Sequence, residues 1–368
     1  MDALVALAIP LDYRSRMSTV QQSLDKAGCD ALLVSSLTNI RYLTGFTGSS
    51  ALLVLRADHA LFVTDFRYGE QATEQLGRAA IDVDLAVDTA PKDPVVTFVT
   101  HCRQVGLEAS HVTWAQQRAY RKDWFPDKEL TPTEGVVETL RVKKELGERA
   151  RIEAAATIAD QALAACLPRL GDRPTEAEFA GELDAMARSF GSYGPAFETI
   201  IASGPNSARP HARPGSRRMQ DGDLVVVDFG ATLDGYRSDM TRTFCLGSPN
   251  VQQQEIYDVV AAAKAAGALK TCGGVAALDV DTAARTVIEE AGWGPQFGHG
   301  TGHGVGLDIH EAPHIGRTST ATLVTGAVVT VEPGIYVVGV GGVRLEDSVV
   351  VQEDGCVALT RSPFILAL

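Results

Sequence analysis

Two pairs of acidic residues stand at predicted β-hairpins, where the fold would bring like charges together. In the first pair, Asp228 lies in the apolar run that begins at Leu224, and Asp239 precedes a second β-rich run. An Asp-Gly turn signal separates the two runs. If the turn centres on the bond between Leu233 and Asp234, the paired aspartates are directly opposed, with Cβ atoms roughly 4.5–5.5 Å apart. Two ionised carboxylates at that spacing repel each other.

The second pair repeats this arrangement in a later part of the chain. Glu332 ends a valine-rich run, and a glycine-rich stretch separates it from Glu346. The two glutamates are equally distant in sequence from Gly339. Buried carboxylates need protons, metal ions or cationic partners. A tolerated surface pair explains one such hairpin more easily than two, so the sequence predicts a positive group among the four carboxylates.

A segment with glycine at every second position, residues 298–306, lies between the two hairpins in the sequence. In a strand, this alternation leaves one face bare and places His299, Thr301 and His303 on the other. Glycine weakens a strand, so we expect these glycines to let another backbone or a ligand approach closely. A phosphate-binding loop fits badly, because the segment has no G-x-G-x-x-G register and no Gly-Lys-Ser/Thr follows it.

One imidazole and four carboxylates form an oxygen-rich ligand set with a single nitrogen. Such a set suits Mn²⁺, Fe²⁺, Co²⁺ or Zn²⁺, whereas Mg²⁺ and Ca²⁺ are less favoured by imidazole. Five ligands are too many for one tetrahedral ion, and they suit two ions roughly 3.5–4 Å apart. Two such ions lower the pKa of a shared water and produce hydroxide near neutral pH. The chemistry that this implies is hydrolysis.

Composition excludes several other classes of function. The net charge of −13 and the pI of about 5.1 argue against nucleic acid as a partner. The six cysteines are scattered without a C-x-x-C pair, which favours free thiols in a reducing compartment, and we expect a cytoplasmic protein. The apolar residues 3–11 follow an acidic residue rather than a basic segment and make a poor signal peptide. No stretch approaches the roughly 20 apolar residues of a membrane helix.

The order of predicted elements indicates two domains. Residues 1–133 alternate strand and helix signals, with buried strands expected at 31–34, 51–55 and 61–64, which indicates an α/β domain. Residues 134–368 combine the two hairpins with helices, which indicates an α+β domain with a mostly antiparallel sheet. We expect these helices over about 136–167, from Pro174 as the first helical residue, and over about 251–268 and 279–292.

Five segments of the second domain together resemble the metal-ligand motifs of the pita-bread metallopeptidases, which include aminopeptidase P, prolidase and methionine aminopeptidase. These segments are 225–230, 238–244, 298–311, 331–336 and 343–347. The resemblance implies two divalent metal ions, for which we expect Mn²⁺, with Co²⁺ or Zn²⁺ as alternatives. The ligands that it implies are Asp228, Asp239, His303, Glu332 and Glu346.

The same resemblance implies roles for further residues. Residues 203–211 resemble a segment that supplies another active-site histidine. We therefore expect His211 or His310 to stabilise the oxyanion or orient the substrate, while Glu332 binds metal and shuttles a proton. His299 is expected to line the proline side of the cleft, and Arg344 to pair with a liganding carboxylate. The remaining histidines, interpreted as surface or packing residues, are His59, His101, His111 and His314.

The first domain narrows the choice of activity. Residues 39–48 and 64–68 resemble the amino-terminal domain of Xaa-Pro peptidases and creatinase. Methionine aminopeptidases of this fold lack that domain, and creatinase lacks the metal ligands. The resemblance implies an Xaa-Pro aminopeptidase, with an Xaa-Pro dipeptidase (prolidase) as the alternative, acting as a homodimer on proline-containing peptides. Two rival classes are a hydrolase or lyase of small non-peptide substrates and a non-catalytic binding protein, and the complete ligand set argues against the latter.

Overall fold

The computed structural model describes residues 2–368, which form two compact units. The smaller unit is Leu11–Arg141, and the larger unit combines residues 2–10 with Val142–Leu368. Each unit has its own cluster of buried apolar side chains. Among the described residues, no helix is both long and apolar enough to cross a bilayer.

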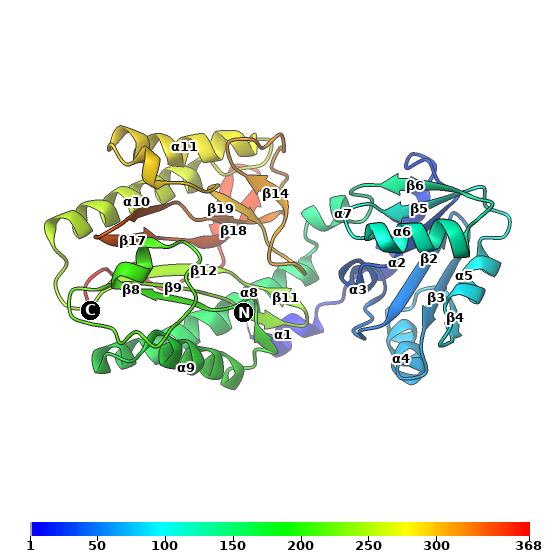
Figure 1. The fold of residues 1–368 in the computed structure, drawn as a ribbon, viewed down its shortest axis with the longest axis horizontal. Helices are drawn as coiled ribbons and strands as arrows, with labels where there is room; N and C mark the ends of the chain where they lie inside the picture. Colours follow the sequence, from blue (N-terminus) through cyan, green and yellow to red (C-terminus); the bar gives the residue numbers. More distant parts are fainter. Residues whose placement is uncertain (1) are drawn as a thin grey trace. The chain divides into compact units, whose positions relative to one another are not determined.

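The smaller unit is built on a six-stranded sheet with the order β4-β3-β2-β1-β5-β6 (Figure 1). Strand β2 is antiparallel to its neighbours β1 and β3, and the other neighbouring strands pair in parallel. The strands are β1 (Ala31–Val34), β2 (Ala51–Arg56), β3 (Ala60–Thr64), β4 (Asp84–Val87), β5 (Gln104–Glu108) and β6 (Glu129–Thr133). The three strands predicted from the sequence are confirmed as β1, β2 and β3.

Helices of the smaller unit alternate with these strands along the chain. They are α2 (Tyr13–Ser23), α3 (Leu37–Thr44), α4 (Gly69–Ala79), α5 (Lys92–Phe98), α6 (Trp114–Ala119), a π-helical turn at Tyr120–Trp124, and α7 (Glu138–Val142) at its end. The α/β class expected for this part of the chain is therefore confirmed.

The larger unit contains antiparallel strands in several small sheets. The sheet orders are β12-β9-β8, β14-β13-β15-β18-β19, β16-β17 and β11-β10-β7. The strands are β7 (Gly194–Pro195), β8 (Ile200–Ser203), β9 (Leu224–Phe229), β10 (Ala231–Leu233), β11 (Tyr236–Arg237), β12 (Met240–Cys245), β13 (Gly302–Gly304), β14 (Glu311–Ile315), β15 (Val328–Val331), β16 (Gly334–Val337), β17 (Gly341–Arg344), β18 (Asp347–Gln352) and β19 (Gly355–Ala358).

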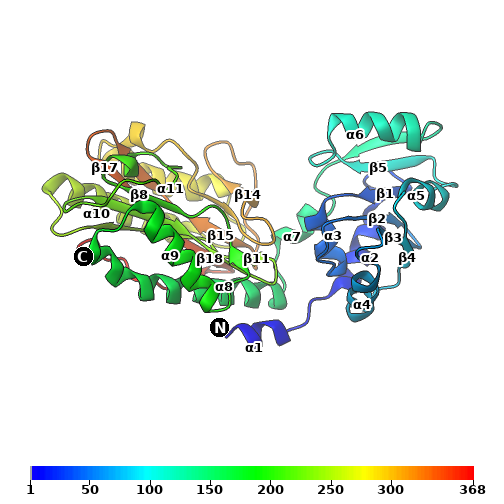
Figure 2. The same ribbon diagram turned by 60° about the horizontal axis from the view of Figure 1, so that its bottom comes forward.

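Long helices cover these strands from two sides. Figures 1 and 2 show α8 and α9 along one side and α10 and α11 along the other. Phe179 of α9 packs in one core with Val225 of β9, and Val260 of α10 packs in another with Ile335 of β16. Every residue of β9 is buried, which explains its unbroken apolar run. The helices are α1 (Ala3–Ala8), α8 (Leu146–Cys166), α9 (Glu176–Ser189), α10 (Val251–Lys270) and α11 (Ala277–Glu290).

Two helix starts differ from the prediction. The helix expected over about 136–167 is interrupted after α7, because Lys143 forms a β-bridge with Ala327 before α8 begins. Pro174 was predicted as the first residue of α9, but the helix begins two residues later. Thr175 is its N-cap, and its hydroxyl accepts a hydrogen bond from the backbone nitrogen of Glu178.

The first carboxylate hairpin has a register two residues away from the predicted one. Its turn residues, Asp234 and Gly235, have φ angles of 47° and 75°, as a type I′ turn requires. The turn therefore centres one residue later than predicted, and Asp228 pairs with Thr241. The prediction that Asp239 directly opposes Asp228 is wrong. Because Asp239 lies two residues from Thr241, the two aspartates are diagonal neighbours on one face.

The predicted register of the second hairpin is confirmed. Strands β16 and β17 pair symmetrically about Gly339, and β15 and β18 continue the same register. Glu332 and Glu346 lie between the β15–β18 pairing and the β16–β17 pairing. Their backbone nitrogens donate elsewhere, from Glu332 to Thr301 O at 2.8 Å and from Glu346 to Thr241 O at 3.1 Å. The second bond joins Glu346 to the strand that follows Asp239.

The alternating glycines allow close approach of backbones, as predicted. A Cβ atom on Gly302 would lie 2.0 Å from the carbonyl oxygen of Thr330. The regular strand is shorter than expected, because β13 covers three residues. Thr301 was predicted on the same face as the histidines, but it is fully buried and its hydroxyl donates to Asp281 of α11 at 2.8 Å. The alternation of side chains between the two faces of a strand therefore does not extend before Gly302.

Candidate metal centre

Three carboxylates from separate segments of the chain converge in the larger unit. Asp228 lies on β9, Asp239 immediately precedes β12, and Glu346 links β17 to β18. One oxygen from each lies within 4.8 Å of the others, and the three residues are at most 8% exposed. The two hairpins thus bring their acidic residues to one place although the register of the first was mispredicted.

Glu332 and His303 join this group, which we call the cage. His303 Nε2 lies 3.3 Å from Glu332 Oε1 and 3.6 Å from Asp239 Oδ2. The other ring nitrogen of His303 lies 3.0 Å from Gly304 O. When that nitrogen carries the proton, Nε2 presents a lone pair to the carboxylates, which is the arrangement of a metal-binding imidazole. The structure therefore brings all five expected ligands together.

The cage carries more negative charge than its protein partners balance. Burial raises the pKa of Asp228, although Arg344 opposes this. Burial and then the charge of Glu346 raise the pKa of Asp239 well above its usual value. Burial and then the charge of Glu332 do the same for Glu346. Within residues 2–368, Asp228 Oδ1 and Glu346 Oε1 have no hydrogen-bond partner. Buried, unpaired carboxylate oxygens beside an imidazole fit divalent cations.

Glu332 differs from the other carboxylates of the cage. Burial favours its neutral form, but the hydrogen bond and charge of His303 outweigh burial and bring the pKa of Glu332 to about 2. The same pairing raises the pKa of His303 against the effect of its burial. The Glu332 side chain is 17% exposed, compared with 6% for Asp239 and 11% for Asp228. It is therefore the most accessible of these three acids.

Arg344 connects the cage to the wall of the site. Its Nη2 lies 2.5 Å from Asp228 Oδ2, and its Nη1 donates to the Tyr336 hydroxyl at 2.7 Å. Its Nε donates to the hydroxyl of Thr241 at 3.1 Å, which in turn donates to Glu346 at 2.6 Å. The expected pairing of Arg344 with a cage carboxylate is confirmed. Burial raises the pKa of Tyr336 to about 12, so its hydroxyl keeps its proton.

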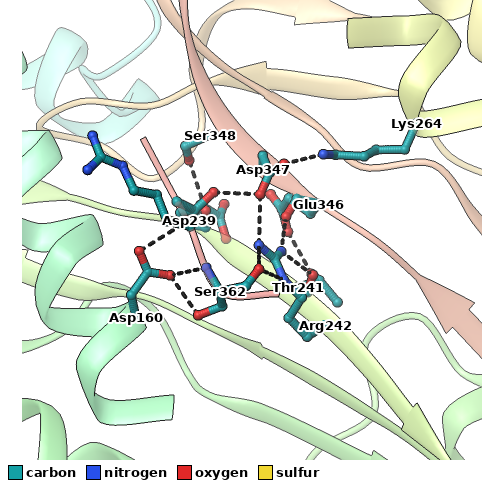
Figure 3. A network of polar contacts seen from close by, with 11 residues as sticks. Asp160, Asp239, Thr241, Arg242, Lys264, Glu346, Asp347, Ser348 and Ser362 are labelled. Atoms are coloured by element: carbon teal, nitrogen blue, oxygen red, sulfur yellow. Dashed lines mark hydrogen bonds and ion pairs between the residues drawn. The ribbon is translucent and has the colours of Figure 1, made fainter. Parts of the chain in front are cut away.

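A buried network of charges supports the backbone behind the cage (Figure 3). Asp347, the residue after Glu346, pairs with Arg242 at 2.9 Å and also with Lys264 of α10. Arg242 additionally donates to the backbone carbonyl of Glu346. The guanidinium thereby holds the backbone of a cage residue while its charge is balanced by Asp347.

The same network extends to Asp239 and to the end of the chain (Figure 3). The Ser348 hydroxyl donates to the backbone carbonyl of Asp239 at 2.8 Å. Arg242 Nε donates to Ser362 O at 2.9 Å, and Ser362 N donates to Asp160 of α8 at 2.7 Å. Hydrogen bonds from this network therefore hold the backbone carbonyls of both Asp239 and Glu346.

The cage opens into a cavity of about 560 Å³. His211, His299 and His310 line it, as the sequence analysis expected for substrate-facing residues. The rings of His303 and His310 meet edge to face, with centroids 4.4 Å apart, and His299 Nε2 lies 3.0 Å from the Tyr336 hydroxyl. Apolar residues complete the wall: Phe197, Ile200, Pro210, Ile309 and Ala312.

His314 also lines the cavity, although its sequence context had suggested a surface or packing residue. It is exposed on β14, two residues beyond Ala312 and four beyond His310, both of which line the cavity as well. Residues two apart share one face of a strand. Extending this two-residue spacing from His310 would have found His314.

Known family models match both units of the chain. The model described as metallopeptidase family M24 matches residues 150–353, more than half of the chain. The chain belongs to metallopeptidase family M24. The creatinase/prolidase N-terminal domain matches residues 16–143 of this M24 peptidase. The pita-bread metallopeptidase resemblance and the two-part fold class inferred from the sequence are confirmed, and the protein is a hydrolase of this family.

Individual relatives align with the M24 peptidase over nearly its full length. It is 40% identical to the uncharacterized peptidase YqhT of Bacillus subtilis, covering 95% of this chain and 98% of that protein. A solved Xaa-Pro dipeptidase from Bacillus anthracis is 37% identical with a TM-score of 0.92, covering 96% and 99% of the two chains. An X-Pro aminopeptidase from Thermotoga maritima is 32% identical with a TM-score of 0.85, covering 94% and 100%.

Proposed function

We propose that this protein is an Xaa-Pro dipeptidase that hydrolyses the peptide bond before proline with the help of two divalent metal ions. The observation that carries the proposal is the convergence of four carboxylates and one imidazole at a cavity, with unpaired buried oxygens on Asp228 and Glu346. The proposed ligands are Asp228, Asp239, His303, Glu332 and Glu346. Their single nitrogen among oxygen donors suits Mn²⁺, Fe²⁺, Co²⁺ or Zn²⁺, and the resemblance to Xaa-Pro peptidases favours Mn²⁺, with Co²⁺ or Zn²⁺ as alternatives.

Bound metal ions would supply a water of lowered pKa and polarise the substrate carbonyl. The protein groups around the cavity then bind the peptide and move protons. We assign proton transfer to Glu332, because its carboxylate is more accessible than those of the neighbouring aspartates. His211 and His310 face the cavity and can donate hydrogen bonds to the developing oxyanion. His299 and the apolar wall are assigned to binding of the substrate.

The choice of dipeptides rests on two observations. The solved Xaa-Pro dipeptidase is more similar to this chain than the X-Pro aminopeptidase, by 37% against 32% identity and by TM-scores of 0.92 against 0.85. In an Xaa-Pro dipeptide, the proline itself carries the free C-terminal carboxylate. His314 is exposed on the wall of the cavity and can donate a hydrogen bond to that carboxylate. The aminopeptidase favoured by the sequence analysis is therefore the second candidate.

We also propose that the enzyme acts as a homodimer in the cytoplasm. The resemblance to Xaa-Pro peptidases supports the dimer, and light scattering coupled to gel filtration tests it. The six cysteines all carry free thiols, which suits a reducing compartment.

Hydrolysis assays on two peptides test the proposed function. The Mn²⁺-loaded protein should cleave a Gly-Pro dipeptide faster than an Xaa-Pro-Pro tripeptide, with products identified by mass spectrometry. Preference for the tripeptide would support the aminopeptidase, and cleavage of neither would reject both. Asp239→Asn should abolish turnover with the fold retained. The matched control is Glu255→Gln, which neutralises an exposed acid on α10 and should leave turnover unchanged.

A further inference from the structure

Glu176 is a fully buried carboxylate that does not face the cavity. It is the first residue of α9, and its exposed fraction is 0%. Its Oε1 accepts hydrogen bonds from the backbone nitrogen of Ser203 at 2.8 Å and from the Ser203 hydroxyl at 2.7 Å. The Asn206 side-chain amide donates to both of its oxygens, at 3.0 and 3.1 Å, and Gly215 N donates to Oε2 at 3.1 Å. A buried carboxylate is retained where such donors satisfy it.

All of these donors belong to residues 203–215, which we call the His211 segment. Its two ends, Ser203 and Gly215, converge on the same carboxylate, so Glu176 closes the segment into a loop. The backbone also joins them, because Ala177 N donates to Gly215 O at 3.0 Å. The hydroxyl of Ser203 accepts a further hydrogen bond from Arg217 at 2.6 Å. The base of the loop is therefore held by charge-assisted hydrogen bonds on both sides.

His211 depends on this loop for its position. Its imidazole lines the cavity, yet in the described part of the chain it makes no hydrogen bond of its own. The adjacent carbonyl of Pro210 accepts from Arg344 at 3.2 Å, which ties the tip of the loop to the cage. The backbone that carries His211 is thus fixed at its tip by Arg344 and at its base by Glu176.

We propose that Glu176 is a positioning residue for His211. The inference rests on the proposed function, which assigns His211 to the substrate. Glu176 touches neither the cavity nor the cage, and it acts by holding both ends of the His211 segment with one carboxylate. An amide cannot replace it, because the NH₂ group of a glutamine would face the donors of Asn206 or Gly215. The loop would then shift, and small displacements of a reacting group reduce turnover strongly.

A double-mutant cycle tests the proposal on the metal-loaded protein. Glu176→Gln should lower kcat for Gly-Pro by about tenfold to a hundredfold. Because Glu176 acts through His211, the double variant Glu176→Gln/His211→Ala should be no slower than His211→Ala alone. Full activity of Glu176→Gln, or losses that multiply in the double variant, would overturn the proposal. The matched control is Glu178→Gln, which removes an exposed acid from the same first turn of α9 and should leave kcat unchanged.

A second measurement does not depend on peptidase activity. Diethyl pyrocarbonate modifies exposed imidazoles, and mass spectrometry reads the rate for the peptide that contains His211. Glu176→Gln should change this rate, while the rate at exposed His101 stays the same. If Glu176→Gln does not fold, Asn206→Ala removes a donor to the same carboxylate and should change the His211 rate in the same direction. Equal His211 rates in wild type and variant would reject the proposal even if the protein cleaved neither peptide.

Discussion

Replacing Arg344 with methionine removes the guanidinium that balances Asp228 in the metal-free protein. The Arg344 side chain is 4% exposed, that of Asp228 is 11% exposed, and their charged atoms are 2.5 Å apart. Loss of one partner from a buried ion pair destabilises a protein by about 3–5 kcal/mol. Because the hydrogen bonds of Arg344 to Tyr336 and Thr241 are lost as well, we expect the upper part of this range, about 4–5 kcal/mol.

Differential scanning calorimetry after treatment with EDTA measures this loss in the transition of the larger unit. At about 2–4 °C per kcal/mol for a unit of this size, the midpoint of Arg344→Met should fall by about 8–20 °C. Added Mn²⁺ should recover part of the loss, because bound cations also balance Asp228.

An exposed pair provides the control for this experiment. Arg317 pairs with Glu289 where the two side chains are 61% and 47% exposed, and such pairs contribute at most about 1 kcal/mol. Arg317→Met should therefore melt within a few degrees of wild type. A metal-free Arg344→Met protein that melts as close to wild type as this control would show that Arg344 does not stabilise the cage.

Two further predictions concern pH and backbone packing. The pKa values of Asp239 and Glu346 are raised in the folded metal-free protein, so the unfolded chain releases these protons first, and stability should fall as pH rises from about 4 towards neutrality. Urea unfolding of the EDTA-treated and the Mn²⁺-loaded protein at pH 5 and pH 7.5 measures this. The gain in unfolding free energy on adding metal should be larger at pH 7.5, and a gain that is no larger there would contradict the prediction. Gly302→Ala places a Cβ 2.0 Å from Thr330 O and should destabilise the larger unit by at least about 2 kcal/mol, whereas Gly298→Ala meets nothing within 4 Å. Equal melting temperatures for the two alanine variants would exclude the steric explanation.

The sequence was sufficient to find the cage because its chemistry is unusual. Carboxylates at two hairpins required a cation whichever register the strands adopted. The register of the first hairpin was mispredicted because Asp234 and Gly235 both adopt positive φ and together form the turn. Asp228 and Asp239 still share one face, since an error of two residues preserves the alternation of a strand.

Features that depend on tertiary contacts were not predictable in this way. The helix expected over about 136–167 is interrupted at Lys143 by a bridge to Ala327, a residue far along the chain. Glu176 reads in the sequence as an ordinary acid in the first turn of a helix, and its role is visible only once residues 203–215 fold around it.

Metal content measured together with turnover tests the proposed metal centre. We propose that two divalent ions required for hydrolysis are held by Asp228, Asp239, His303, Glu332 and Glu346. Protein loaded with Mn²⁺ and freed of excess metal by gel filtration can be assayed for metal by plasma mass spectrometry and for Gly-Pro hydrolysis in the same fractions. We expect about two ions per active chain, with both metal and activity lost in Asp239→Asn. Full hydrolytic activity in fractions without bound metal would contradict it.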